Sequence, residues 1–123
     1  MNRRETLKLM GATALAGMTG LPQLANAAGQ EMVVVVKIAG IPWFNALEVG
    51  VKKAGGEFGI NASMVGPSAV DPAQQVKLIE DLIAKKVAVI GLVPLDVKVT
   101  EPVLKRAQAA GIKVITHEGP EQA

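Results

Sequence analysis

Short apolar runs rich in β-branched residues alternate with longer amphipathic stretches along most of the chain. Residues 32–39 (MVVVVKIA) and 87–93 (VAVIGLV) are apolar at both alternating sets of positions, which is typical of strands covered on both faces. Residues 60–65 form a shorter and more polar run, and residues 112–116 form another short run. The pattern predicts four strands.

The first amphipathic stretch has a helical period from Asn45 onwards. Gly55 and Gly56 each cost a helix about 1 kcal/mol relative to Ala, so we expect its last turn to be weak. Gly59 is placed to end this helix as a C-terminal cap. The buried face is expected to carry Leu47, Val51, Ala54 and Phe58.

The second helix has the clearest start in the chain. Asp71 is placed as its N-cap, Pro72 as its first residue and Gln74 as the partner that closes a capping box. A third helix is expected to begin near Thr100 and to end at Gly111. The buried positions should be Val76, Ile79, Leu82 and Ile83 in the second helix, and Val103, Leu104, Ala107 and Ala110 in the third.

Strands that alternate with helices in this way predict an α/β fold, a three-layer arrangement around a parallel sheet with right-handed crossovers. The first and third strands are the most continuously apolar, so they should be central. The more polar second strand should lie at an edge. These assignments give the strand order 2-1-3-4.

The first 27 residues have a different character. Residues 1–8 are basic, residues 9–21 are small and apolar, and Ala25-Asn26-Ala27 fits a small-x-small cleavage site before Ala28. The apolar part is shorter than the roughly 20 residues that cross a bilayer. We therefore expect a cleaved export signal over 1–27 and a periplasmic product, with an amphipathic N-terminal helix of the fold as the alternative.

Paired arginines suggest the export route. Arg3-Arg4, followed by Leu7 and Lys8, resembles a twin-arginine signal, although Thr6 stands where such signals usually have a large apolar residue. Twin-arginine export is therefore favoured over general secretion.

Composition narrows the possible partners and cofactors. Without Arg3, Arg4, Lys8 and Glu5, the 13 basic and 11 acidic residues become ten of each, so the mature chain is neutral. Neutrality removes the compositional support for a nucleic-acid partner, which would need a basic face. The chain has no Cys and one His, which excludes disulfides and thiolate chemistry and argues against a zinc site. No cofactor is expected.

Polar and aromatic side chains gather just after the predicted strand ends. In a doubly wound sheet, ligands bind beyond those carboxyl ends, at the point where the strand order reverses. Aromatic faces pack on the C–H surface of a sugar, and carboxylates and amides bind its hydroxyls. The set therefore favours a small polyhydroxylated solute. Its members are Trp43, Phe44 and Asn45 after the first strand, Asp96 after the third, and His117 and Glu118 after the fourth.

Each of these side chains also has an ordinary structural explanation. The aromatic pair can cover the end of the core, and Asn45 can cap the helix that follows. Asp96 can stabilise a turn, which is the explanation that we favour for it. The histidine and its acidic neighbour can be solvated loop residues.

Enzymatic functions lack the required motifs. Gly40-Ile41-Pro42-Trp43 places a proline and a bulky ring where a dinucleotide pyrophosphate needs bare backbone. The sequence has no phosphate-binding P-loop motif and no G-x-S-x-G nucleophile elbow. A small exported α/β enzyme that acts on carbohydrate nevertheless remains the alternative to a binding protein.

Four segments carry a family resemblance: VVVVKIAGIPWFNALEVGVKKAG, GPSAVDPAQQVKLIEDLIAKK, VPLD and LKRAQAAGIKVITHEGP. Through them, residues 32–121 resemble the beginning of a periplasmic sugar-binding protein of ABC importers, the class that includes ribose-, rhamnose- and autoinducer-2-binding proteins. The resemblance implies a monomeric, non-enzymatic binder that delivers a sugar or sugar-like solute to an inner-membrane permease.

The resemblance also implies which residues contact the sugar. They are the aromatic pair Trp43 and Phe44 with Asn45, then Asp96, and then Glu118 with His117. Ribose-binding members have an Asp-Arg pair after the fourth strand, where this chain has Glu118-Gly119.

Binding proteins of this class close two α/β lobes around the ligand, at roughly 100–150 residues per domain. Residues 28–123 would then be a truncated N-terminal lobe, with the fourth strand as an unpaired edge. We expect this length of chain to be prone to aggregation and to bind sugar weakly or not at all.

Overall fold

Strands and helices alternate along residues 30–119, the part of the chain that the computed structural model describes. The neighbouring strands are parallel and lie in the order β2-β1-β3-β4, as predicted from the sequence. The export signal predicted for residues 1–27 lies outside the described residues. The strands are β1 (Glu31–Val35), β2 (Asn61–Val65), β3 (Val89–Leu92) and β4 (Lys113–Thr116), and the helices are α2 (Pro42–Phe58), α3 (Pro72–Lys85) and α4 (Val97–Ala109).

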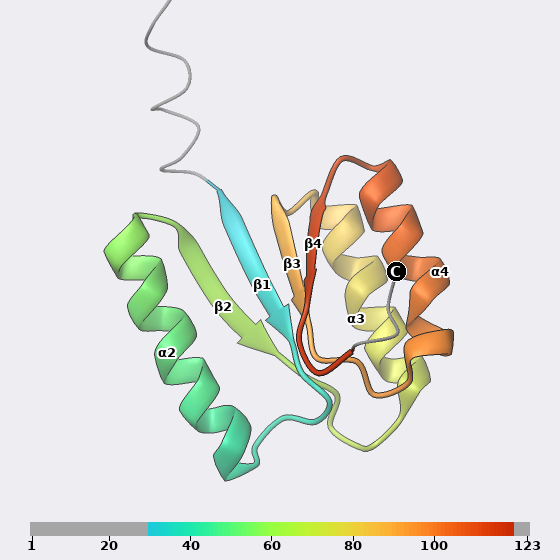
Figure 1. Cartoon of the computed structure of the whole chain (residues 1–123), viewed down its shortest axis with the longest axis horizontal. Coiled ribbons are helices and arrows are strands. Elements are labelled where there is room, and N and C mark those ends of the chain that lie inside the picture. The colour runs from blue at the N-terminus through green and yellow to red at the C-terminus, as the bar shows by residue number, and fades with distance from the viewer. Residues whose placement is uncertain (1–29, 120–123) are drawn as a thin grey trace, which may run out of the picture.

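Helices cover both faces of the sheet (Figure 1): α2 lies on one side, and α3 and α4 lie on the other. Val33 and Val35 of β1 belong to the core cluster under α3 and α4, whereas Val34 and Val36 belong to the smaller cluster under α2. Because successive side chains of a strand point to opposite faces, a strand buried on both sides needs apolar residues at every position. This explains the unbroken run of valines.

The start of α3 follows the prediction in part. Asp71 is its N-cap and accepts a hydrogen bond from the backbone N–H of Ala73 (2.8 Å), and Pro72 is its first residue. Gln74 was expected to close a capping box, but its Oε1 instead accepts a hydrogen bond from the Ser68 hydroxyl (3.3 Å). The side chain of Gln74 therefore ties α3 to the preceding loop.

Two helices begin earlier than the sequence indicated. Helix α2 starts at Pro42, so its N-cap is Ile41 and not Asn45. Helix α4 starts at Val97, with Asp96 as its N-cap, rather than near Thr100. In α2 the cap residue forms no side-chain hydrogen bond, so nothing polar in the sequence marks the boundary.

Glycines shape both the end and the packing of α2. Gly59 caps the helix in the left-handed conformation (φ 66°), as predicted. A Cβ atom at Gly55 would lie 2.8 Å from the Ala62 Cβ and 3.0 Å from the Ile60 carbonyl oxygen. Gly55 therefore allows α2 to approach β2 closely, a role that the helix propensity of glycine does not reveal.

The predicted core is found with two corrections. Phe58 is 75% exposed, because it is the last residue of α2 and the chain turns away at the Gly59 cap. Ala110 is also exposed, since α4 ends one residue before it. The buried stripe of α4 consists of Thr100, Val103, Leu104 and Ala107.

Candidate functional site

The loops that follow β1 and β4 are joined by an ion pair at the carboxyl end of the sheet. Lys37 Nζ lies 3.2 Å from Glu118 Oε2, and both side chains are partly exposed. Strand β3 lies between β1 and β4, so this pair reaches across the end of β3. The result is a solvent-accessible ammonium group beside a carboxylate at the edge where parallel α/β sheets bind their ligands.

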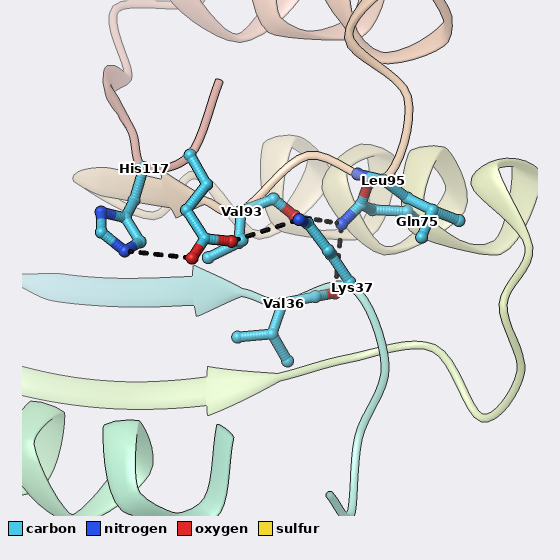
Figure 2. Close-up of polar contacts among 7 residues, drawn as sticks. Val36, Lys37, Gln75, Val93, Leu95 and His117 are labelled. Atoms are coloured by element: carbon cyan, nitrogen blue, oxygen red, sulfur yellow. Dashed lines mark hydrogen bonds and ion pairs between the residues drawn. The ribbon is translucent and has the colours of Figure 1, made fainter. Parts of the chain in front are cut away.

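His117 lies next to this ion pair, directly before Glu118 in the loop after β4 (Figure 2). His117 Nε2 is 3.9 Å from Glu118 Oε1, and the imidazole is largely exposed. The backbone N–H of His117 donates to the Leu92 carbonyl (2.9 Å), which continues the pairing of β4 with β3. Glu118 has φ +57°, a left-handed conformation that is uncommon outside glycine.

A buried glutamine connects the loops after β1 and β3 (Figure 2). The side-chain amide of Gln75 donates to the carbonyl oxygens of Val36 (3.1 Å) and Val93 (2.9 Å), and its Oε1 accepts from the backbone N–H of Leu95 (2.9 Å). Gln75 is completely buried. Sequence analysis missed it, although one signal was present: Gln75 lies four residues before Ile79, at a position of the buried stripe of α3.

The two adjacent aromatic residues at the start of α2 have different environments. Trp43 is 67% exposed, whereas Phe44 is 4% exposed and packs with Val34, Val36 and Val93. Phe44 thus covers the end of the core, and Trp43 presents its ring to solvent. Asn45 is exposed.

A turn-stabilising role was favoured for Asp96 from the sequence, whereas in the structure Asp96 is the N-cap of helix α4. Its Oδ1 accepts a hydrogen bond from the backbone N–H of Val99 (3.0 Å) at the start of α4. The residue is exposed, so its carboxylate also faces solvent at the carboxyl end of β3.

The Lys77–Asp81 ion pair lies apart from the residues at the carboxyl end of the sheet. The pKa of Lys77 is raised, chiefly by its hydrogen bond to Asp81 Oδ1 (3.0 Å), but this pair lies along the exposed side of α3. Between residues 30 and 119, no cluster of three or more His, Asp and Glu residues is arranged to hold a metal ion. In the same range, no helix combines the length and apolar character needed to cross a bilayer.

A hollow of about 460 Å³ lies at the opposite end of the sheet, at the amino ends of β3 and β4. Lys86 is its one charged lining residue. The hollow therefore lacks the mixture of acidic, basic and amide groups found beyond the carboxyl ends, and the carboxyl end remains the better candidate site. The lining residues are Ile83, Lys86, Val87, Ala88, Ala110, Gly111 and Ile112.

Comparison with protein families identifies one match: the family described as "Periplasmic binding protein domain" matches residues 32–123. Among solved structures, a solute-binding protein of an ABC transporter from Burkholderia graminis, in complex with D-arabinose, is 33% identical with a TM-score of 0.71. The alignment covers 76% of this chain and 33% of that protein.

Two further structures are similar. A solute-binding protein from Clostridium phytofermentas with bound L-rhamnose is 25% identical (TM-score 0.68) and is aligned over 72% of this chain and 27% of its own. LsrB from Clostridium saccharobutylicum, in complex with AI-2, is 24% identical (TM-score 0.68) over 70% of this chain and 26% of its own, which is a likeness of fold. The chain thus spans about a third or less of the length of these proteins.

Proposed function

Since the chain belongs to the periplasmic binding protein domain family, we propose that it is part of the substrate-binding component of an ABC importer and binds a sugar or sugar-like solute in the periplasm. The relatives with bound D-arabinose and L-rhamnose support this ligand class. Ribose, rhamnose and autoinducer-2 are the ligands that the sequence resemblance favours.

The observation that carries the proposal is the ion pair between Lys37 and Glu118. An ammonium group offers three donors and a carboxylate offers only acceptors, so together they match hydroxyl groups, which both donate and accept. The pair lies at the carboxyl end of the sheet and is open to solvent, so a sugar can reach both groups. Lys37 is a site residue that the sequence analysis did not select.

The remaining predicted residues take distinct roles in this proposal. Trp43 stacks on the apolar face of the sugar, because its ring is the exposed member of the aromatic pair. Asn45, Asp96 and His117 supply further hydrogen bonds from the surrounding loops. Phe44 supports the site from the core, since its ring is buried beneath the loop after β1.

The lengths of the related structures support a two-lobed arrangement. We propose that residues 28–123 form part of the N-terminal lobe and that a second lobe would cover the sugar from the other side. Residues 1–27 would direct export by the twin-arginine route, with cleavage near Ala27 and Ala28. The closed monomer would then deliver its sugar to an inner-membrane permease.

The test is a titration of the full chain with D-arabinose, L-rhamnose and D-ribose. Binding is monitored by the fluorescence emission of Trp43, the single tryptophan, and by NMR, which detects weak binding. At least one sugar should change both signals. Replacing Glu118 with Gln should weaken binding about tenfold or more, because hydrogen bonds to a charged group contribute about 1.5–3 kcal/mol.

Glu80→Gln is the matched control. Glu80 is also paired with a cation, Arg106 (2.8 Å), and its side chain has the same 42% exposure as that of Glu118. This variant should bind the sugar as the wild type does. Binding by this part of one lobe is expected to be weak, and equal losses in the two variants would contradict the proposed site. Chromatography should recover the sugar unchanged, whereas a converted product would favour the carbohydrate-acting enzyme.

A further inference from the structure

Gln75 lies where the pairing of the two central strands ends. The last hydrogen bond between them runs from the backbone N–H of Val93 to the Val35 carbonyl (2.9 Å). Beyond it the two chain segments separate, one towards α2 and the other towards α4. The carbonyl oxygens of Val36 and Val93 lie at this divergence, and both accept from the Gln75 amide.

The amide group suits this position because of its hydrogen-bonding capacity. A glutamine NH₂ group has two donors, and both are used here on different strands, while the oxygen accepts from Leu95. An apolar side chain could fill the same space, but it would leave three buried or partly buried backbone groups without these partners. The side chain therefore replaces the missing strand pairing at the divergence.

We propose that Gln75 is a positioning residue that fixes the spacing between the loop carrying Lys37 and the loop carrying Asp96. Lys37 directly follows Val36, and Asp96 directly follows Leu95, so two of the three contacts of Gln75 lie one residue from a group of the site. The description of these groups as a sugar site rests on the proposed function. The mechanical coupling of the loops does not depend on it.

The coupling can be measured without sugar, by NMR of the isotope-labelled full chain. Gln75→Met keeps an apolar side chain of similar length and removes all three hydrogen bonds. The Leu95 amide should then exchange with solvent about tenfold faster or more relative to amides within β1, because its buried acceptor is gone. The signals of Lys37 and Glu118 should also shift.

Ile79→Val is the control for a general loss of stability. Ile79 is completely buried on the same helix, one turn after Gln75, and its shortening lowers stability without removing a hydrogen bond. This variant should leave the Leu95 exchange ratio and the Lys37 and Glu118 signals as in the wild type. Equal changes in both variants, or an unchanged Leu95 amide in Gln75→Met, would overturn the proposal.

Gln75→Glu tests the same idea if the methionine variant does not fold. The new carboxyl would be buried facing the carbonyl oxygens of Val36 and Val93, which raises its pKa above the usual value for Glu. The protonated acid retains one donor for these carbonyl oxygens and one acceptor for the Leu95 N–H, whereas the ionised acid has only acceptors. The NMR signals of Val36, Val93 and Lys37 should therefore shift as the pH rises through this pKa, because the contact with the two carbonyl oxygens is lost. A pH profile equal to that of the wild type would overturn the proposal.

A titration with D-arabinose separates this inference from the proposed function. If the wild type binds, Gln75→Met should weaken binding about tenfold more than Ile79→Val does; equal binding would overturn the positioning role. If the wild type binds none of these sugars, this arm gives no support to the proposed function, and the exchange of the Leu95 amide alone decides whether Gln75 couples the loops.

Discussion

Replacing Gly55 with Ala should destabilise the protein, whereas the same replacement at the adjacent Gly56 should stabilise it. Both glycines lie in the last turns of α2, where Ala is favoured over Gly by about 0.5–1 kcal/mol. A Cβ at Gly56 meets nothing within 4 Å, so the full gain in helix propensity should appear there. Gly56→Ala is therefore the matched control for the packing of Gly55.

The expected loss at Gly55 follows from what its new methyl group would meet. The three nearest atoms are Ala62 Cβ at 2.8 Å, the Ile60 carbonyl oxygen at 3.0 Å and the Ala62 backbone nitrogen at 3.3 Å. Two of them are backbone atoms, so a side-chain rotation cannot relieve the contact and α2 must move away from β2. Overpacking of this kind costs about 1–3 kcal/mol, which leaves a net loss of up to about 2 kcal/mol after the propensity gain.

Urea unfolding of the two variants, followed by far-UV circular dichroism, measures both free energies of unfolding. A difference of about 2 kcal/mol should separate the variants, which corresponds to roughly 8–16 °C in Tm for a domain of this size. Equal stabilisation by the two substitutions would refute the argument, because it would mean that α2 does not need its close approach to β2.

Two further substitutions test the capping and the charge pair. Asp71→Ala should lower the free energy of unfolding by about 1 kcal/mol, since it removes the acceptor for the Ala73 N–H, while Asp71→Asn should retain most of the stability; equal losses in thermal unfolding would argue against capping. Lys37→Met should change stability by no more than about 1 kcal/mol, because the ion pair is partly exposed, but it should weaken sugar binding in calorimetry. Lys105→Met, which breaks the exposed pair with Glu101, should leave sugar binding intact.

Much of the fold could be predicted because its signals are local. The doubly buried strands show as continuous β-branched runs, and Asp71 with Pro72 marks a helix start. The start of α2 could not be located in this way, because Ile41 has no capping side chain. Helix α4 starts at Val97, three residues before the predicted Thr100, and it contains Pro102, a residue type that is usually found in the first turn.

The candidate site was less predictable because its main contacts join distant segments. Lys37 and Glu118 are 81 residues apart in the sequence, and each alone resembles an ordinary solvated charge. Gln75 was not selected, because periodicity identifies helix faces from apolar residues and cannot recognise a polar side chain that is buried for its hydrogen bonds. Residue type and position at a strand end identified the carboxyl end of the sheet as the candidate site. They did not identify Lys37 as the partner of Glu118, or Gln75 as the link between the loops.

The placement of β1 between β2 and β3 has a consequence for how the chain folds during synthesis. Glu31 pairs with Asn61, 30 residues later, and Met32 pairs with Val89, 57 residues later. Parallel pairings at such separations form slowly, because the entropy cost of closing a long loop precedes the stabilising contacts. The valine-rich central strand β1 is therefore the first strand of the described region to leave the ribosome. It stays without its second neighbour, β3, until 57 more residues have been synthesised. During that interval its apolar side chains and unpaired backbone groups are exposed to aggregation, which a chaperone would limit.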